Sequence, residues 1–258
     1  MKRAFTLIEL LVVVAIIAIL AAILFPVLSQ AKQAAKKTQS IAQIRQIMMA
    51  WRLYNGDYDD MIMRASIPAG SKTIYWWGSF DGSTLVEREG LLFPYMKNTQ
   101  IQVDPTFPSQ LRTALWLTGY GYNYHYLSPS DYLPPNYEEV PIPVSESQIA
   151  STSETVAFAS AARIDDWSGP SPVLQGNTYI DPPSFDYPGI HGRAANHAVI
   201  AWTDEHVASR RPDLRSIDFG YGHSAEAFRR ENLGDILKPG CPVGSGCQDY
   251  FYSLVKDE

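Results

Sequence analysis

The 258-residue chain is long enough for one large domain or two small ones, and its 46% hydrophobic and 19% charged residues argue against wholesale disorder. Its formal net charge of −6 excludes the strongly basic surface that nucleic-acid-binding proteins use, so no nucleic-acid partner is expected.

The N-terminal segment joins a short basic start to a long apolar run. Every residue from Leu10 to Leu28 is apolar, Pro26 included. At about 1.5 Å per residue, a helix of this length nearly crosses a hydrocarbon core of about 30 Å. A secretory signal has an apolar region of only about 7–15 residues that ends in a small-residue cleavage site. The run therefore predicts a retained transmembrane helix.

Two features distinguish this segment from a generic membrane anchor. Glu9 places a carboxylate one turn inside the apolar stretch. A charge in hydrocarbon costs on the order of several kcal/mol unless it is paired, so Glu9 is a candidate functional residue. The second feature is the basic leader, Met1–Ala4, which ends in a small residue directly before Phe5.

The residues Ala4-Phe5-Thr6-Leu7-Ile8-Glu9 resemble the type III leader junction of type IV prepilins and type II secretion pseudopilins. The resemblance implies cleavage after Ala4 by prepilin peptidase, on the cytoplasmic side of the membrane, and methylation of the new amino-terminal Phe5. It also implies that Glu9 is the assembly carboxylate, which can pair with the Phe5 amine of a neighbouring subunit. Pro26 stands where the family has a helix-kinking proline. Ala4 replaces the usual Gly and is still small, so processing is expected.

The same resemblance implies a function and a location. The expected protein is a structural subunit of a type IV pilus or a type II secretion-like pseudopilus. It would cross the bacterial inner membrane once, with its head outside the cytoplasm, and then enter an extracellular or periplasmic filament. Its partners would be prepilin peptidase, other pilin or pseudopilin subunits in a homo-oligomeric filament, and the inner membrane. The alternative is a minor tip module that recognises a surface or a polysaccharide.

Beyond the apolar run, residues 29–56 continue a helical pattern that becomes amphipathic. Its apolar residues recur at steps of three or four: Ile41, Ile44, Met48 and Trp51. Asn55-Gly56 predicts the end of the helix. We expect a leader at residues 1–4, a transmembrane or filament-core helix at 5–28, an amphipathic helix at 29–56 and a globular head at 57–258.

Segments of the head that are rich in aromatic and β-branched residues predict strands: Thr73–Phe80, Tyr120–Leu127, Thr155–Ala162 and His197–Thr203. Asp204-Glu205 predicts a turn, and His206–Arg210 predicts its return strand. The expected fold class is α+β and type IV pilin-like, with one long N-terminal helix packed on an antiparallel sheet that carries long loops.

The other segments of the head are predicted to be irregular. Leu85–Met96 predicts a short helix that is broken near Pro94. Ser128–Pro143 is rich in proline and predicts an exposed loop, and Ser168–Gly189 is similar.

The head shows a second, weaker resemblance, carried by Gln43–Ile47 and Leu92–Lys97. These segments are similar to a large bacterial group of prepilin-like proteins that carry a carboxy-proximal His-x9-Asp-Gly element. The nearest counterpart here runs from His191 to Asp204-Glu205, with twelve intervening residues instead of nine and Glu in place of Gly. Asp104-Pro105 stands where the group often has Cys-Pro.

The two cysteines, Cys241 and Cys247, bracket Pro and Gly and can close a short disulfide loop in an oxidising compartment. The alternatives are two free thiols or half of a metal site, although zinc needs about four ligands. No Gly-rich phosphate loop, GxSxG elbow or nucleophilic cysteine context occurs in the sequence, so neither an enzyme nor a cofactor is expected.

Three further groups of residues carry weaker hypotheses. Metal ligands, or turn-stabilising hydrogen bonds, could come from His191, His197, Asp204 and His206. Calcium binding, or a solvated turn after the helix, could come from Asp57-Tyr58-Asp59-Asp60. A sugar- or surface-binding patch, or part of the core, could come from Trp76-Trp77 and Tyr120–Tyr126.

Overall fold

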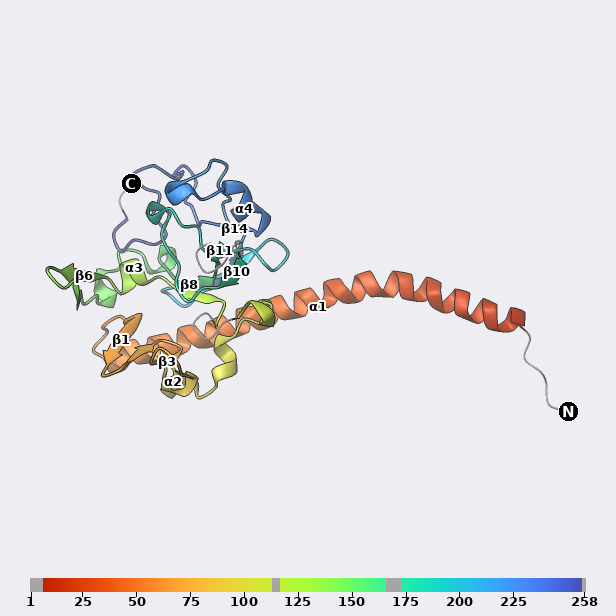
Figure 1. The fold of residues 1–258 in the computed structure, drawn as a ribbon, viewed down its shortest axis with the longest axis horizontal. Helices are drawn as coiled ribbons and strands as arrows, with labels where there is room; N and C mark the ends of the chain where they lie inside the picture. Colours follow the sequence, from red (N-terminus) through yellow and green to blue (C-terminus); the bar gives the residue numbers. More distant parts are fainter. Residues whose placement is uncertain (1–6, 113–116, 166–172, 257–258) are drawn as a thin grey trace.

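The computed structural model describes residues 7–112, 117–165 and 173–256, and the statements below concern these residues. Helix α1 (Leu7–Asp57) runs through the predicted transmembrane and amphipathic segments without a break. Figure 1 shows that its C-terminal half carries the head, whereas its N-terminal half extends away from the head. The predicted long helix is therefore confirmed over the described residues.

The helix ends one residue later than the predicted segment 29–56. It continues past Asn55-Gly56 to Asp57, and the left-handed residues that follow are Asp59 (φ 55°) and Asp60 (φ 60°). The Asn55 side chain has a different role, because its Oδ1 accepts a hydrogen bond from the Met63 backbone N–H (3.0 Å). Asn55 thus fixes the chain that follows the helix.

The named strands pair antiparallel throughout, in a first sheet, a central sheet and short pairs. The first sheet contains, in order, β1 (Ser66–Ala69), β2 (Lys72–Tyr75), β3 (Gly78–Phe80) and β4 (Leu85–Val86). The central sheet contains, in order, β13 (Val207–Arg210), β12 (Ala198–Trp202), β8 (Val156–Ser160) and β5 (Tyr120–Tyr122). The pairs are β6 (Ser130–Leu133) with β7 (Glu138–Pro141), β9 (Ala162–Asp165) with β10 (Val173–Gly176), and β11 (Ile190–His191) with β14 (Leu233–Gly234).

Short helices connect these strands: α2 (Phe93–Met96), α3 (Tyr124–Leu127) and α4 (Ala225–Arg230). Single turns of 3-10 helix occupy Glu87–Glu89, Thr99–Gln102, Ser109–Leu111, Glu146–Gln148, Thr152–Glu154, Pro183–Phe185 and Gly220–Gly222. The combination of one long N-terminal apolar helix with antiparallel sheets confirms the α+β, pilin-like architecture expected from the sequence.

The core forms where the C-terminal half of α1 lies between α2 and the central sheet (Figure 1). Three residues of the predicted amphipathic stripe are buried (Ile44, Met48 and Trp51), and the fourth, Ile41, is partly buried against the same core. Ile47 and Tyr54, which adjoin the stripe, are buried with it. Trp51 Nε1 donates a hydrogen bond to Tyr122 Oη (3.3 Å), and Tyr122 in turn donates to the Met63 carbonyl (2.8 Å). The helix is thus joined to β5 by packing and by polar contacts.

The single strand predicted at Thr73–Phe80 is wrong. Tyr75 pairs with Gly78, so β2 and β3 form a hairpin whose turn is Trp76-Trp77. Both indoles are buried, and Trp76 packs edge-on against Phe158 with ring centroids 5.3 Å apart. Burial of these two large rings outweighs the strand propensity of the segment. Trp76-Trp77 accordingly belongs to the core and not to a surface patch.

The short helix predicted within Leu85–Met96 is confirmed only at its end, as α2, and β4 and a 3-10 turn precede it. Pro94 lies in the first turn of α2. Backbone N–H groups in the first turn of a helix have no partner within the helix, so the absence of an N–H on proline costs no hydrogen bond there. In Ser128–Pro143 the predicted exposure holds, but the segment folds into the β6–β7 hairpin. Within Ser168–Gly189, β10 and a 3-10 turn replace part of the predicted loop, and residues 166–172 lie outside the described residues.

Other predicted strands are confirmed in whole or in part. Tyr120–Leu127 divides into β5 and α3, and Thr155–Ala162 contains β8. The hairpin predicted at His197–Arg210 is confirmed as β12 and β13, with Glu205 in the left-handed conformation (φ 72°) at its turn.

Candidate functional site

The N-terminal half of α1 presents an apolar surface that the described part of the head does not cover. Between Leu7 and Leu28 its large apolar side chains are between 47% (Val13) and 78% (Leu7) exposed. By length and composition, this helix can cross a membrane. Exposure of apolar area to water costs about 25 cal/mol per Å², so the surface requires lipid or packed helices around it.

Glu9 lies in this exposed half, between Ile8 (72% exposed) and Leu10 (56% exposed). A carboxylate in the first turn of a helix gains about 0.3–1 kcal/mol from the helix macrodipole. Placing an acidic side chain at the centre of a membrane helix costs more, about 2.5–3.5 kcal/mol. The dipole alone therefore does not account for a glutamate among these apolar residues.

Pro26 lies inside the same half, and α1 continues through it. Proline lacks the N–H that would bond to the carbonyl of Ala22, and its ring crowds that carbonyl. The structure thus places Glu9 and Pro26 on one exposed helical segment. Ala4 and Phe5, the predicted processing residues, lie outside the described residues.

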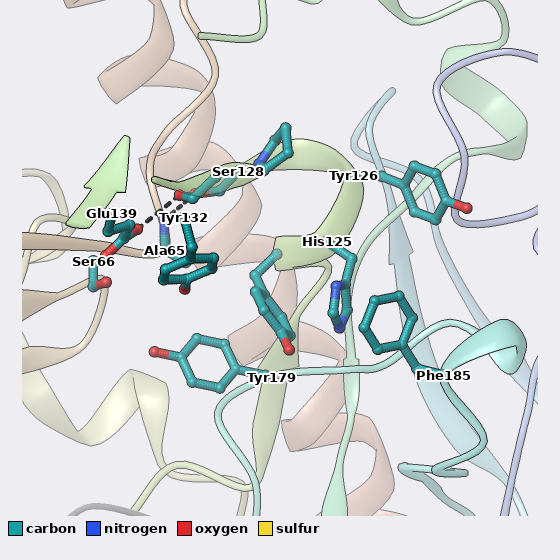
Figure 2. Close-up of a pocket in the computed structure, with 12 residues that line it drawn as sticks. Ala65, Ser66, His125, Tyr126, Ser128, Tyr132, Glu139, Tyr179 and Phe185 are labelled. Atoms are coloured by element: carbon teal, nitrogen blue, oxygen red, sulfur yellow. Dashed lines mark hydrogen bonds between the residues drawn. The ribbon is translucent and has the colours of Figure 1, made fainter. Parts of the chain in front are cut away.

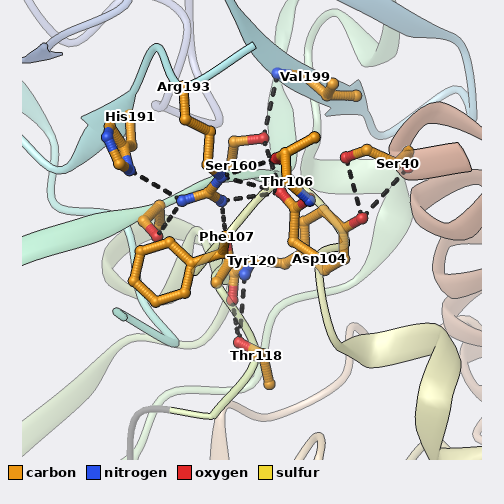
Figure 3. A network of polar contacts seen from close by, with 12 residues as sticks. Ser40, Asp104, Thr106, Phe107, Thr118, Tyr120, Ser160, His191, Arg193 and Val199 are labelled. Atoms are coloured by element: carbon orange, nitrogen blue, oxygen red, sulfur yellow. Dashed lines mark hydrogen bonds and ion pairs between the residues drawn. The ribbon is translucent and has the colours of Figure 1, made fainter. Parts of the chain in front are cut away.

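A buried ion pair between Asp104 and Arg193 occupies the interior of the head (Figure 3). Arg193 Nη2 and Nε lie 2.9 Å and 3.0 Å from Asp104 Oδ2, and Asp104 is fully buried. The other oxygen, Asp104 Oδ1, accepts hydrogen bonds from the Thr106 N–H (2.8 Å) and hydroxyl (2.6 Å). The guanidinium also donates to the Ala161 and Gly119 carbonyls. One arginine thus ties the Asp104 loop to the ends of β5 and β8.

His191 takes part in the same network. Its Nδ1 lies 2.9 Å from Arg193 Nη1, and arginine can only donate, so Nδ1 must be the acceptor. His191 is therefore the neutral tautomer with its proton on Nε2. Burial, and secondarily the charge of Arg193, hold the pKa of His191 well below 6.5. We call Asp104, His191 and Arg193 the polar centre.

The four residues considered as metal ligands are not brought together. His191 belongs to the polar centre, whereas His206 Nδ1 contacts Asp204 Oδ1 (2.5 Å) at the β12–β13 turn. His197 Nδ1 contacts the Ala195 carbonyl (2.8 Å). Over the described ranges, no three His, Cys, Asp or Glu side chains form a group that could hold a metal ion.

The acidic run after α1 adopts a turn, which is the alternative to a calcium loop. The Asp60 N–H donates to the Asn55 carbonyl (2.9 Å). Asp57 Oδ2 accepts a hydrogen bond from the Tyr95 hydroxyl (2.8 Å), so this carboxylate joins the end of α1 to α2.

Cys241 and Cys247 form the predicted disulfide, with their Cα atoms 5.3 Å apart. The bridge closes a short loop C-terminal to β14, and Cys241 is buried.

A pocket of about 720 Å³ opens beside α3 and β6 (Figure 2). Its lining includes Tyr124–Tyr126, which belong to the aromatic segment singled out in the sequence. The sequence did not indicate Tyr132, Tyr179 or Phe185, which come from regions predicted as loops. Their one sequence signal is an aromatic side chain within a polar or proline-rich stretch.

Residues 1–25 match the family described as the prokaryotic N-terminal methylation motif. No curated protein matches the chain, and no solved structure does. The motif is consistent with a type IV pilin-like protein, and it supports a substrate of prepilin peptidase of the pilin or pseudopilin class. Together with the exposed apolar helix, it indicates membrane anchoring. Membership of the His-x9-Asp-Gly group stays a prediction.

Proposed function

We propose that this protein is a structural subunit of a type IV pilus or a type II secretion-like pseudopilus, assembled through residues 5–28. The observation that carries the proposal is Glu9 within the exposed apolar half of α1, outside the described part of the head. The methylation motif over the same residues supports it. An apolar helix of this kind serves as a membrane anchor before assembly and as a packing surface afterwards.

The physical argument concerns the charge. When such helices pack side by side, the solvent around Glu9 is lost, and a carboxylate must then pair with a cation or take up a proton. Cleavage after Ala4 creates an amine on Phe5, four residues before the glutamate. The Phe5 amine of a neighbouring subunit would then supply the cation at that depth.

The disulfide supports the orientation of the chain. Cytosolic thiols are generally kept reduced, so the Cys241–Cys247 bridge favours a head outside the cytoplasm. The proposed location is the bacterial inner membrane before assembly, with a single pass and an external head, and a periplasmic or extracellular filament afterwards.

Intact-mass and amino-terminal peptide spectrometry of membrane protein from the producing cells tests the processing step. The expected mature chain begins at Phe5 and carries an added methyl group. Ala4→Gly is the matched control and should be processed as well as the wild type, whereas the bulky Ala4→Leu should accumulate as precursor. Recovery of the wild-type chain with Met1 intact would refute the proposal.

A second candidate function is a minor tip component that binds a surface. The pocket beside α3 and β6 favours it, because Figure 1 places these elements at the opposite end of the molecule from the N-terminal half of α1. Abundance separates the two functions, since a main subunit dominates filaments sheared from cells and a tip component makes up a trace of them.

A further inference from the structure

The pocket beside α3 and β6 is lined by aromatic rings that form a continuous row (Figure 2). The ring centroids of Tyr179 and Tyr124 are 4.7 Å apart. Those of Tyr124 and His125 are 3.9 Å apart, and those of His125 and Phe185 are 3.6 Å apart. Tyr132 contributes a further ring from β6. The pocket therefore offers several ring faces to one ligand.

Two of the rings that line the pocket are more than half exposed. Phe185 is 54% exposed and Tyr132 is 61% exposed, although both line the pocket. Aromatic side chains stabilise a fold most when they are buried, so rings held open around a cavity indicate a surface prepared for a ligand. The volume of about 720 Å³ lies within the range of about 300–1,000 Å³ that is typical of ligand pockets.

The polar groups around the pocket are held in place by their neighbours. Asp181 Oδ1 lies 2.9 Å from His125 Nε2 and accepts a hydrogen bond from the Tyr124 hydroxyl (3.2 Å). At the β6–β7 hairpin, Glu139 Oε1 accepts hydrogen bonds from Ser130 Oγ (2.7 Å) and Arg64 Nη2 (3.2 Å). Glu139 is thus paired with the Arg64 guanidinium, and Asp181 with the His125 ring and the Tyr124 hydroxyl, so each carboxylate is held in position by its partners.

We propose that this pocket binds a neutral oligosaccharide. A pyranose ring has an apolar C–H face that packs on aromatic rings, and a rim of hydroxyls that both donate and accept hydrogen bonds. Tyr132 and Phe185 supply packing faces, and Glu139 and Ser130 supply polar partners at the pocket edge. Glu139 in the lining favours a neutral sugar over a uronic acid, because the carboxylates of a uronic acid would be repelled by it.

This site deepens the second candidate function, a tip component that binds a surface, and is independent of the filament function, because it lies on the head and uses no residue of the exposed half of α1. The experiment therefore uses single full-length chains in lipid nanodiscs, which avoids detergents with sugar headgroups. Isothermal titration calorimetry is run with cellotetraose, laminaritetraose and mannotetraose as neutral probes. Tetragalacturonate serves as the acidic counterpart, and a proline-rich decapeptide probes for a peptide groove lined by tyrosines.

At least one neutral tetrasaccharide should bind with a dissociation constant below about 1 mM. Tyr132→Ala and Phe185→Ala should each weaken that binding at least about fivefold, because each removes a packing face. The matched control is Tyr137→Asn, which removes a 73% exposed ring from the turn of the same hairpin but outside the pocket lining. Asparagine tolerates the left-handed backbone at that position (φ 52°), so the turn is kept.

The control should bind like the wild type, and melting temperatures equal to that of the wild type would show that each variant keeps an intact head. The proposal is overturned if no neutral tetrasaccharide binds, or if both ring variants bind as tightly as Tyr137→Asn. Tighter binding of tetragalacturonate, or of the proline-rich peptide, would overturn it in favour of an acidic glycan or a peptide.

Discussion

At the scale of single residues, the polar centre shows how the buried Arg193 determines the protonation state of His191. Arg193 is held by Asp104 and by backbone carbonyls, and its position is therefore fixed independently of His191. Because arginine can only donate, it requires a lone pair on His191 Nδ1. A proton on that atom would break the hydrogen bond and bring two positive charges together.

This arrangement predicts a dependence of stability on pH. Below pH 6.5 the unfolded chain takes up a proton at His191, whereas the folded chain does not until its lowered pKa is reached. The unfolded state then binds more protons, so the free energy of unfolding must fall as the pH drops below 6.5, by up to about 1.4 kcal/mol per pH unit. Well above pH 6.5 this residue contributes no pH dependence.

Thermal unfolding of the full chain between pH 7.5 and pH 5 compares the wild type with His191→Gln. Glutamine keeps an acceptor for Arg193 but does not titrate, so the variant should lose less stability on acidification. The contributions of the other titratable groups are shared by the two proteins. Parallel pH profiles would mean that His191 accepts a proton in the folded state as readily as in the unfolded chain.

Sequence patterns could not have predicted the polar centre. In the sequence, Asp104 is noticed only as part of Asp104-Pro105, and His191 only as the start of the element that runs to Asp204. No sequence pattern points to Arg193. These residues meet because β5 pairs with β8 and the residue after β8 bridges to β11, which brings together segments that are far apart in the chain. The pair Cys241 and Cys247 was predictable, because a short loop alone brings the two thiols together.

At the scale of elements, α1 is one helix with two different surfaces. Its spacing predicts both, since an unbroken apolar run favours lipid or packed helices and a stripe at steps of three and four favours a single buried face. The Trp76-Trp77 turn shows the limit of such patterns. Bulky aromatic residues in sequence favour a strand, and only the packing of the whole core buries both rings at a turn.

The buried face of α1 predicts that mutations at two nearby positions, Trp51 and Met49, will change the stability of the head by very different amounts. Trp51 is fully buried and donates to Tyr122, whereas Met49 is 58% exposed. Trp51→Ala should destabilise the head by about 3–5 kcal/mol, because it leaves a cavity and removes the hydrogen bond to the Tyr122 hydroxyl. Met49→Ala should change the stability by less than about 0.5 kcal/mol.

Thermal unfolding of both variants in the same lipid or detergent measures the contrast. For a chain of this size, about 1 kcal/mol shifts the midpoint by roughly 2–4 °C, so Trp51→Ala should melt at least about 5 °C lower than Met49→Ala. Similar midpoints would show that α1 does not depend on this face for its attachment to the head.

At the scale of the whole molecule, the parts with candidate functions lie at opposite ends. The exposed apolar half of α1 extends away from the head, and the aromatic pocket lies at the far end beside α3 and β6 (Figure 1). A subunit assembled through its helix would therefore keep its pocket free to face outwards. This separation allows assembly and ligand binding to be altered independently by mutation.

We propose that Glu9 directs assembly, and the yield of filaments sheared from cells that produce Glu9→Ala tests this role. We expect normal processing at Phe5, a membrane-inserted and folded subunit, and a filament yield at least about tenfold lower than that of the wild type. Glu9→Gln should fail in the same way, because the amide keeps the shape of the side chain but not its charge. Leu10→Ala, a neighbouring change that keeps the carboxylate, should still assemble. Wild-type filament yields from correctly processed Glu9→Ala and Glu9→Gln chains would show that the Glu9 carboxylate has no role in assembly.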